Sequence, residues 1–361
     1  MLVLHIVGAR PNFMKAAPVI DALRRRNNIA QTLVHTGQHY DSNMSDIFFE
    51  EVGIPRPDRN LNVGSGSHAY QTGTIMIEVE KIIQDVKPDI VLVYGDVNST
   101  VAGAIVCSKL KIKVAHVEAG LRSRDRSMPE EINRILTDQI ADLLFTPSAD
   151  GDQNLLQEGV AKERIHMVGN VMIDTLIHLF PKIVDRWDDL KTKLGIKEKK
   201  YILVTLHRPS NVDDPSMLSN IMKILCDLSQ SIDVVFPVHP RTRACIRKNN
   251  IPVSSKGLLL QEPMGYLDFL CLQKNATFVI TDSGGIQEET TFLNVPCLTV
   301  RDSTERPITV ELGTDILVGT DINVLNKEIE NLMHGDAKKG SIPPLWDGHA
   351  SERIARIIAD V

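Results

Sequence analysis

Residues 2–12 run Leu2-Val3-Leu4-His5-Ile6-Val7-Gly8-Ala9-Arg10-Pro11-Asn12. The first six are apolar except for His5, and three of them are β-branched, which predicts a short buried strand. The glycine after them predicts a tight turn, and an amphipathic pattern follows from residue 14 to residue 26. Because a crossover helix is the usual link between parallel strands, this strand–turn–helix unit indicates an α/β fold.

The same unit recurs along the whole chain. Further strands are expected over 32–36, 90–93 and 114–117, and further helices over 69–86, 100–110 and 130–141. A helical stretch from 171 to about 187 precedes a second series of strands, expected over 201–206, 234–238, 257–260, 278–281 and 297–300. We therefore predict two Rossmann-like doubly wound domains. The first comprises residues 1–170 and a terminal helix at about 348–361 that packs back on it, and the second comprises residues 171–347.

Composition narrows the classes of protein that the chain can be. Its 361 residues suffice for roughly two domains, each able to bury its own core. With 43% hydrophobic and 24% charged residues it matches ordinary globular proteins, not disordered, collagen-like or membrane proteins. The 40 basic and 46 acidic residues give a net charge of −6, which argues against a nucleic-acid partner.

Cysteine usage and the start of the sequence bear on the compartment. The five cysteines are scattered without CxxC or Cys/His ligand spacing, which suits a reducing environment. The sequence opens on a strand without a basic leader, and no run reaches the roughly 18 apolar residues of a membrane span. We expect a cytoplasmic protein that has no membrane partner.

Polar residues follow the predicted strands at the ends where ligands of open parallel sheets bind. If the two domains face each other, these strand ends should line one cleft. The residues concerned lie in the segments 8–12, 37–39, 95–96, 118–120, 207–209, 239–241 and 282–285.

A phosphate site is indicated by Asp282-Ser283-Gly284-Gly285-Ile286-Gln287-Glu288-Glu289, which links a strand to a helix. Glycines allow close approach to the backbone, and a helix N-terminus offers free N–H groups. Glu289 could hold ribose hydroxyls, while Arg10 and Arg306 could supply the fixed cations. An ordinary tight turn between strand and helix is the alternative. Neither GxGxxG nor GxxxxGK[ST] occurs, so we expect no dinucleotide cofactor.

Ionisable residues gather in the first domain. Asp96 and Glu118 end two expected strands, Lys15 follows the Arg10 turn, and Glu130 stands at a helix start, where acids also favour the helix dipole. Carboxylates at buried strand ends are costly unless a site uses them, and several together can divide acid and base roles. In the second domain His207 and His239 are candidate acids, bases or phosphate contacts. No two of these candidate residues have the i,i+4 spacing of a ligand pair, so no metal is expected. His5 and His116, within strands, are expected to be hydrogen-bonded core residues.

Taken together, these motifs resemble the non-hydrolysing UDP-N-acetylglucosamine 2-epimerase family. The resemblance runs in order along nearly the whole chain and is carried by residues 8–15, 95–96, 116–122, 129–134, 207–208, 282–289 and 301–307. It implies a glycosyltransferase-B-type fold and interconversion of UDP-GlcNAc and UDP-ManNAc without NAD or metal. The implied mechanism eliminates UDP across C1–C2 to give a 2-acetamidoglucal, and adds it back after the proton returns on the other face. A homodimer is also implied.

The resemblance assigns site residues motif by motif. As catalytic residues it implies Lys15, Asp96, Glu118, Glu130 and His207. As substrate-binding residues it implies Arg10, Arg122, His239, Phe269, Ser283, Gly284, Gly285, Glu289 and Arg306.

Departures from the family pattern leave alternatives open. His207-Arg208-Pro209-Ser210-Asn211 differs from the usual His-Arg-Arg-Glu-Asn. The segment 38–41 and His68 differ from the residues that hold an activating second UDP-GlcNAc in many bacterial members. The segments 38–41 and 65–71 also look like relatives that epimerise UDP-2,3-diacetamido-2,3-dideoxyglucuronate. A hydrolysing 2-epimerase, a retaining UDP-sugar glycosyltransferase and a non-catalytic nucleotide-sugar sensor are the remaining alternatives.

Overall fold

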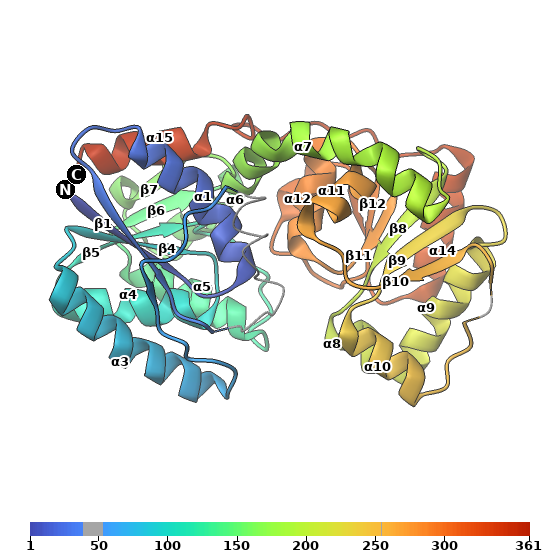
Figure 1. The fold of residues 1–361 in the computed structure, drawn as a ribbon, viewed down its shortest axis with the longest axis horizontal. Helices are drawn as coiled ribbons and strands as arrows, with labels where there is room; N and C mark the ends of the chain where they lie inside the picture. Colours follow the sequence, from blue (N-terminus) through green and yellow to red (C-terminus); the bar gives the residue numbers. More distant parts are fainter. Residues whose placement is uncertain (39–52, 254) are drawn as a thin grey trace. The chain divides into compact units, whose positions relative to one another are not determined.

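The computed structural model describes residues 1–38, 53–253 and 255–361, and its chain forms two compact units (Figure 1). Unit 1 comprises Met1–His178 and Pro344–Val361, and unit 2 comprises Leu179–Pro343. The helix α7 (Val171–Leu194) begins in unit 1 and ends in unit 2. Residues 39–41, part of the segment 38–41 discussed above, lie outside the described residues.

Unit 1 is built on a parallel sheet with the strand order β3-β2-β1-β4-β5-β6-β7. Its order places β1 and β4 at the centre, so their side chains are buried on both faces. This explains why these strands are continuous apolar runs and do not alternate. The strands are β1 (Leu2–Val7), β2 (Ala30–His35), β3 (Arg59–Asn60), β4 (Ile90–Tyr94), β5 (Lys113–Val117), β6 (Leu143–Thr146) and β7 (Ile165–Met167).

Helices cover both faces of this sheet. In Figure 1, α3, α4 and α5 lie along one face, and α1 and α15 lie together on the other. A core under α3 and α4 joins Ile75, Val79 and Ile83 to the strand residues Leu4 and Val91. The helices are α1 (Arg10–Arg24), α3 (His68–Val86), α4 (Asn98–Leu110), α5 (Pro129–Ile140), α6 (Ala149–Gln157) and α15 (Ala350–Ala359), with a 3₁₀ turn at Lys162–Arg164.

The terminal helix α15 belongs to unit 1 although all of unit 2 separates it from the rest of that unit in sequence. Its first N–H groups, those of Ala350 and Ser351, donate to the buried carboxylate of Asp174 at 3.2 and 2.7 Å. Trp346 Nε1 donates to the Pro147 carbonyl at 2.9 Å. The apolar face of α15 packs against α1, the helix that carries Arg10 and Lys15.

Unit 2 repeats the plan with a parallel sheet in the order β10-β9-β8-β11-β12-β13. One core lies under α9, α10 and α14, and a second lies under α11, α12 and the end of α7, where Trp187 stacks on Tyr201. The strands are β8 (Tyr201–Thr205), β9 (Asp233–Pro237), β10 (Leu258–Gln261), β11 (Val279–Thr281), β12 (Cys297–Thr299) and β13 (Asp315–Leu317). The helices are α8 (Pro209–Val212), α9 (Pro215–Leu228), α10 (Pro240–Lys248), α11 (Tyr266–Asn275), α12 (Gly284–Leu293), α13 (Pro307–Glu311) and α14 (Ile322–His334).

The strands and helices predicted from the sequence are confirmed, mostly with shifts of a few residues at their ends, although the helix expected to end at about residue 187 continues to Leu194. The helix expected from residue 14 begins at Arg10, where Pro11 suits the first turn. Four strands were not predicted: β3, β6, β7 and β13, of two to four residues each. Among the described residues, no helix is long and apolar enough to cross a membrane.

Candidate active site

The end of β5 in unit 1 carries a buried ion pair. Lys15 reaches from α1 to Glu118, with 2.7 Å between Nζ and Oε2, and the two side chains are only 8% and 4% exposed. Arg10, the first residue of the same helix, is partly buried. Two of the predicted catalytic residues, Lys15 and Glu118, are thus in direct contact.

The backbone around this pair is unusual. Gly95, after β4, has φ +64°, and a Cβ there would lie 2.9 Å from Lys15 Nζ, so the position favours glycine. Glu118 itself has φ +74°, a strained conformation for a residue with a side chain. The N–H groups of Glu118 and Ala119 both donate to the Phe145 carbonyl, at 3.1 and 3.0 Å, and hold this turn. Backbone strain of this kind is typical of functional sites.

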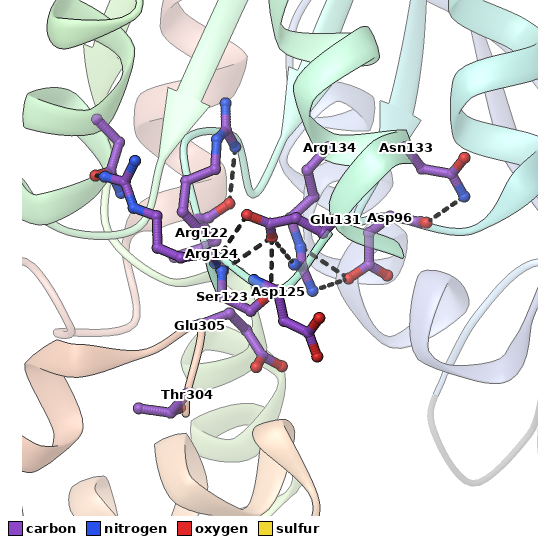
Figure 2. A network of polar contacts seen from close by, with 12 residues as sticks. Asp96, Arg122, Ser123, Arg124, Asp125, Glu131, Asn133, Arg134, Thr304 and Glu305 are labelled. Carbon is purple, nitrogen blue, oxygen red and sulfur yellow. Dashed lines mark hydrogen bonds and ion pairs between the residues drawn. The ribbon is translucent and has the colours of Figure 1, made fainter. Parts of the chain in front are cut away.

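Asp96 follows Gly95 and is bound by Arg134 from α5 (Figure 2). Arg134 donates to Asp96 Oδ2 from Nε at 3.1 Å and from Nη2 at 2.7 Å. Asn133 Nδ2 donates to the Asp96 carbonyl at 2.9 Å. The Asp96 side chain is 24% exposed, so this carboxylate is oriented but still accessible.

The neighbouring Glu130 and Glu131 differ sharply. Glu131 is buried and accepts hydrogen bonds from the N–H groups of Ser123 and Arg124, at 2.9 and 3.0 Å, and from Arg134 Nη1 at 2.7 Å (Figure 2). It therefore fastens the loop after β5 to the start of α5. Glu130 is half-buried, and its carboxylate makes no hydrogen bond or ion pair with another residue of the described ranges. Of the two, Glu130 is the one whose carboxylate is available for chemistry.

Arg122 lies deeper than a substrate contact usually does. Its guanidinium pairs with Asp138 at 2.7 Å, binds both Glu158 oxygens at 2.8 and 2.7 Å, and donates to the Leu121 carbonyl. Burial opposes its charge, but the hydrogen bonds and charges of Glu158 and Asp138 raise the pKa of Arg122 above its usual value. Its assignment to substrate binding stays a prediction.

In unit 2 the end of β11 supplies a buried carboxylate, Asp282, that organises the loop after β8. It accepts from the His207 N–H at 3.0 Å, the Arg208 N–H at 2.8 Å and Asn211 Nδ2 at 3.1 Å, while His207 Nδ1 lies 3.0 Å from Oδ1. Burial alone would raise the pKa of Asp282, yet these hydrogen bonds and the charge of His207 lower it. The His207 ring is 42% exposed and lies 5.9 Å, centroid to centroid, from the ring of His239.

The predicted phosphate turn forms the N-terminus of α12. Ser283 is the N-cap residue, and its side chain makes no capping hydrogen bond. Arg306 lies against this turn, with Nε 2.8 Å from Glu288 Oε1 and Nη1 2.6 Å from Glu305 Oε1. A Cβ on Gly284 would approach Arg306 Nη1 to 2.5 Å, whereas one on Gly285 would meet nothing within 4 Å. The structure thus brings Ser283, Gly284, Gly285 and Arg306 together.

Further along α12, Glu289 is buried and accepts a hydrogen bond from Tyr266 Oη at 2.7 Å. With the Gln273 amide in the orientation that satisfies its neighbours, Nε2 donates to the other Glu289 oxygen at 3.0 Å. Phe269, one turn along α11 from Tyr266, is partly buried against the core around Leu272. Glu289 and Phe269 therefore belong to adjacent helices, α12 and α11.

The residues that orient the candidate site were not predicted from the sequence, because they lie on a helix and not at a strand end. Glu131, Arg134 and Asp138 project from one buried face of α5, where an apolar stripe would be usual. Their i, i+3, i+7 spacing was the available signal, because charged residues on the face expected to be buried imply partners. His5 and His116 are confirmed as hydrogen-bonded core residues. Among the residues that the structure describes, no three His, Cys, Asp or Glu side chains are arranged to hold a metal ion.

Known proteins are similar to this chain over nearly its full length. The family model described as UDP-N-acetylglucosamine 2-epimerase matches residues 21–359. The chain is 46% identical over 360 residues to UDP-N-acetylglucosamine 2-epimerase of Methanocaldococcus jannaschii, covering 98% of this chain and 97% of the relative. It is 40% identical over 363 residues to UDP-2,3-diacetamido-2,3-dideoxy-D-glucuronate 2-epimerase of Pseudomonas aeruginosa, covering 99% of each.

Solved structures agree with these relatives. The crystal structure of the M. jannaschii UDP-GlcNAc 2-epimerase in complex with UDP-GlcNAc and UDP matches with a TM-score of 0.90 and 45% identity over 100% of both chains. The predicted class, two Rossmann-like doubly wound domains of the glycosyltransferase-B type, is confirmed. Within that class, the chain belongs to the UDP-N-acetylglucosamine 2-epimerase family, which is a family of isomerases.

Proposed function

We propose that this protein inverts C2 of a UDP-2-acetamido sugar, converting UDP-GlcNAc to UDP-ManNAc and back without hydrolysis. The observation that carries the proposal is the set of ion-paired carboxylates, Glu118 with Lys15 and Asp96 with Arg134, at adjacent strand ends of a chain with this family's fold. The relative of 46% identity, named for this activity, supports the same substrate.

The chemistry needs a proton to leave one face of C2 and return to the other. As the C2–H bond breaks, its electron pair forms the C1=C2 bond of a 2-acetamidoglucal, and the C1–O bond breaks to release UDP. Protonation of C2 on the opposite face and renewed attack of UDP on C1 complete the inversion. Two proton-transfer groups serve this better than one, because each face needs a positioned acid or base. We assign these roles to the group comprising Asp96, Glu118, Glu130 and His207, with Lys15 holding Glu118.

The leaving diphosphate needs positive charge and N–H donors as its negative charge develops. We assign these to Arg10, Arg306 and the N-terminus of α12 at Ser283, Gly284 and Gly285. Glu289, on the same helix, would accept hydrogen bonds from the ribose hydroxyls. Phe269 and His239 would complete the contacts to UDP.

One experiment tests both the substrate and the mechanism. The purified protein is incubated with UDP-GlcNAc in D₂O, without added nicotinamide or metal, and the products are followed by NMR. We expect UDP-ManNAc that carries deuterium at C2. Free ManNAc with UDP would instead identify a hydrolysing enzyme, and product that stays protiated at C2 would refute elimination with solvent exchange.

UDP-2,3-diacetamido-2,3-dideoxyglucuronate is the second candidate substrate, because the P. aeruginosa relative named for it is 40% identical over nearly the full length. The same incubation with this sugar nucleotide decides between them by their kcat/KM values.

We further propose that the protein acts as a cytoplasmic homodimer, as the family resemblance implies. The five free cysteines suit that compartment. Light scattering of the purified protein should give twice the mass of one chain.

A further inference from the structure

A chain of buried charges lies behind Asp96 and Glu118 in unit 1. At its centre is Asp138 of α5, which is fully buried. Its Oδ1 lies 2.6 Å from His116 Nδ1, and its Oδ2 accepts from the Gly120 N–H at 3.1 Å and pairs with Arg122 Nη1 at 2.7 Å. Asp138 thus joins strand β5 to the turn that follows Glu118.

His116 extends this chain to the other loop. Its Nε2 lies 2.8 Å from the carbonyl oxygen of Gly95, the residue before Asp96. Because a carbonyl only accepts, Nε2 must carry the hydrogen. One imidazole therefore links the Gly95–Asp96 turn, through Nε2, to Asp138 and the Glu118–Gly120 turn, through Nδ1.

Arg122 closes the chain on its far side. Besides Asp138, it binds both oxygens of Glu158 from α6. His116 and Asp138 have no exposed surface and Arg122 has 4%, so none of the three is placed as an accessible acid or base.

Stability alone does not explain why His116, Asp138 and Arg122 are buried. Ion pairs in a core are often no more stabilising than apolar side chains of similar volume. Geometric control explains the arrangement better. The chain's hydrogen bonds end on the turns that carry Asp96 and Glu118, and Glu118 is held in a strained backbone conformation.

We propose that His116, Asp138 and Arg122 are positioning residues that fix the separation of the Asp96 and Glu118 carboxylates for proton transfer. The inference rests on the function proposed above and deepens it. Small displacements of reacting groups, of about 1 Å, can slow a reaction about 100-fold. We call the contact of His116 with the Gly95 carbonyl its Gly95 arm and the contact with Asp138 its Asp138 arm. Loss of either arm should therefore lower kcat while leaving UDP binding intact.

The two arms can be cut separately. The amide nitrogen of asparagine can replace Nδ1, and that of glutamine can replace Nε2. His116→Asn thus keeps the link to Asp138 and loses the Gly95 arm, and His116→Gln does the reverse. His5→Asn is the matched control, because His5 is an equally buried histidine, in β1 on the other side of β4, bonded to Tyr94 Oη and Gln31.

For each variant, kcat and KM with UDP-GlcNAc are measured by NMR, and the Kd for UDP by calorimetry. We expect kcat to fall about 10- to 100-fold in both His116 variants, with the UDP Kd unchanged. The His5→Asn enzyme should keep its kcat. Full activity in both His116 variants, or an equal loss in His5→Asn, would overturn the inference.

Hydrogen exchange by mass spectrometry gives a readout that does not depend on activity. His116→Asn should exchange faster than His5→Asn in peptides covering residues 95–98, and His116→Gln should do so in peptides covering residues 118–123. If the wild type turned over no UDP-sugar, the proposed function would fail, and exchange alone would still test the link between the turns. Unchanged exchange in both segments would refute that link whatever the activity.

Discussion

Charged residues follow the strands of both units, but unit 1 presents carboxylates paired with cations and unit 2 presents a guanidinium paired with carboxylates. In unit 1 the carboxylate of Asp96 pairs with Arg134, and that of Glu118 pairs with Lys15. In unit 2 the guanidinium of Arg306 is held by two carboxylates, beside a helix N-terminus rich in glycine. Two sheets of similar topology therefore present different chemistry, because different residues follow their strands.

This contrast suggests a division of labour. Oriented carboxylates suit proton transfer, and a fixed arginine with backbone N–H groups suits a diphosphate. If it is correct, substitutions in unit 1 should act on rate and substitutions in unit 2 on nucleotide affinity.

The largest effect is expected from the unit 1 carboxylates. Asp96→Asn and Glu118→Gln should each lower kcat by about 10²- to 10⁴-fold, because each removes a proton-transfer group while keeping its shape. The Kd for UDP, measured by calorimetry, should not change. Asp89→Asn is the control. Asp89 precedes β4, the strand that Asp96 follows, and accepts a hydrogen bond from the Leu2 N–H at the opposite end of that strand. A large drop in UDP affinity in the two test variants would contradict the division.

Acid should destabilise unit 1 through His5. Burial lowers the pKa of His5 to about 4, against 6.5 for the unperturbed group. Between these values the unfolded chain binds the proton and the folded chain does not, so stability is lost as the pH falls from 6.5 towards 4. The loss between pH 7 and pH 4.5 should be about 2–3 kcal/mol.

Urea denaturation of wild type and His5→Asn at both pH values measures this contribution. The variant has no imidazole at that position and should lose less stability on acidification. Equal losses in the two proteins would show that His5 is not responsible.

Arg306→Ala should weaken UDP binding by about 1.5–3 kcal/mol, the usual loss for a charged hydrogen bond. It should lower kcat less than the carboxylate variants do once UDP-sugar is saturating. Calorimetry with UDP measures the affinity, and the exposed Arg247→Ala on α10 is the control for loss of one positive charge. An unchanged Kd would remove Arg306 from the diphosphate site.

The smallest effects should separate the two glycines of the α12 turn. Gly284→Ala places a Cβ against Arg306 and Glu305 and should destabilise the fold on the order of 1 kcal/mol. Gly285→Ala meets open space, so its stability should stay within about 0.5 kcal/mol of wild type. If UDP approaches the backbone at Gly285, the affinity of the Gly285→Ala protein for UDP should nevertheless fall. Thermal unfolding without UDP measures the stability of each variant, and unfolding with UDP measures its affinity. If UDP stabilised Gly285→Ala as much as the wild type, close approach of UDP at Gly285 would be contradicted.

The sequence predicted the fold well where runs of apolar residues were long enough to show a period. β1 and β4 were recognisable because their residues are buried on both faces. The strands β7 and β13 have three residues each, too few to reveal any pattern.

The site was predictable in part for a related reason. Asp96, Glu118 and Asp282 directly follow strands, and strand ends of parallel sheets are known in advance to meet. Arg134 and Asp138 lie in the middle of a helix, where a charged residue usually faces water. Their roles depend on tertiary contacts 38 and 22 residues away in sequence, with Asp96 and His116, which no local pattern specifies.

Unit 1 consists of two segments that are far apart in the sequence, and this has a consequence for protein synthesis. A ribosome completes residues 1–178 long before it reaches residues 344–361, yet α15 covers α1 and is capped by Asp174. The side of α1 that packs against α15 therefore stays uncovered while all of unit 2 is translated. Unit 2 is continuous in sequence and can acquire its native contacts first, so the domain that begins the chain should be the last to finish folding.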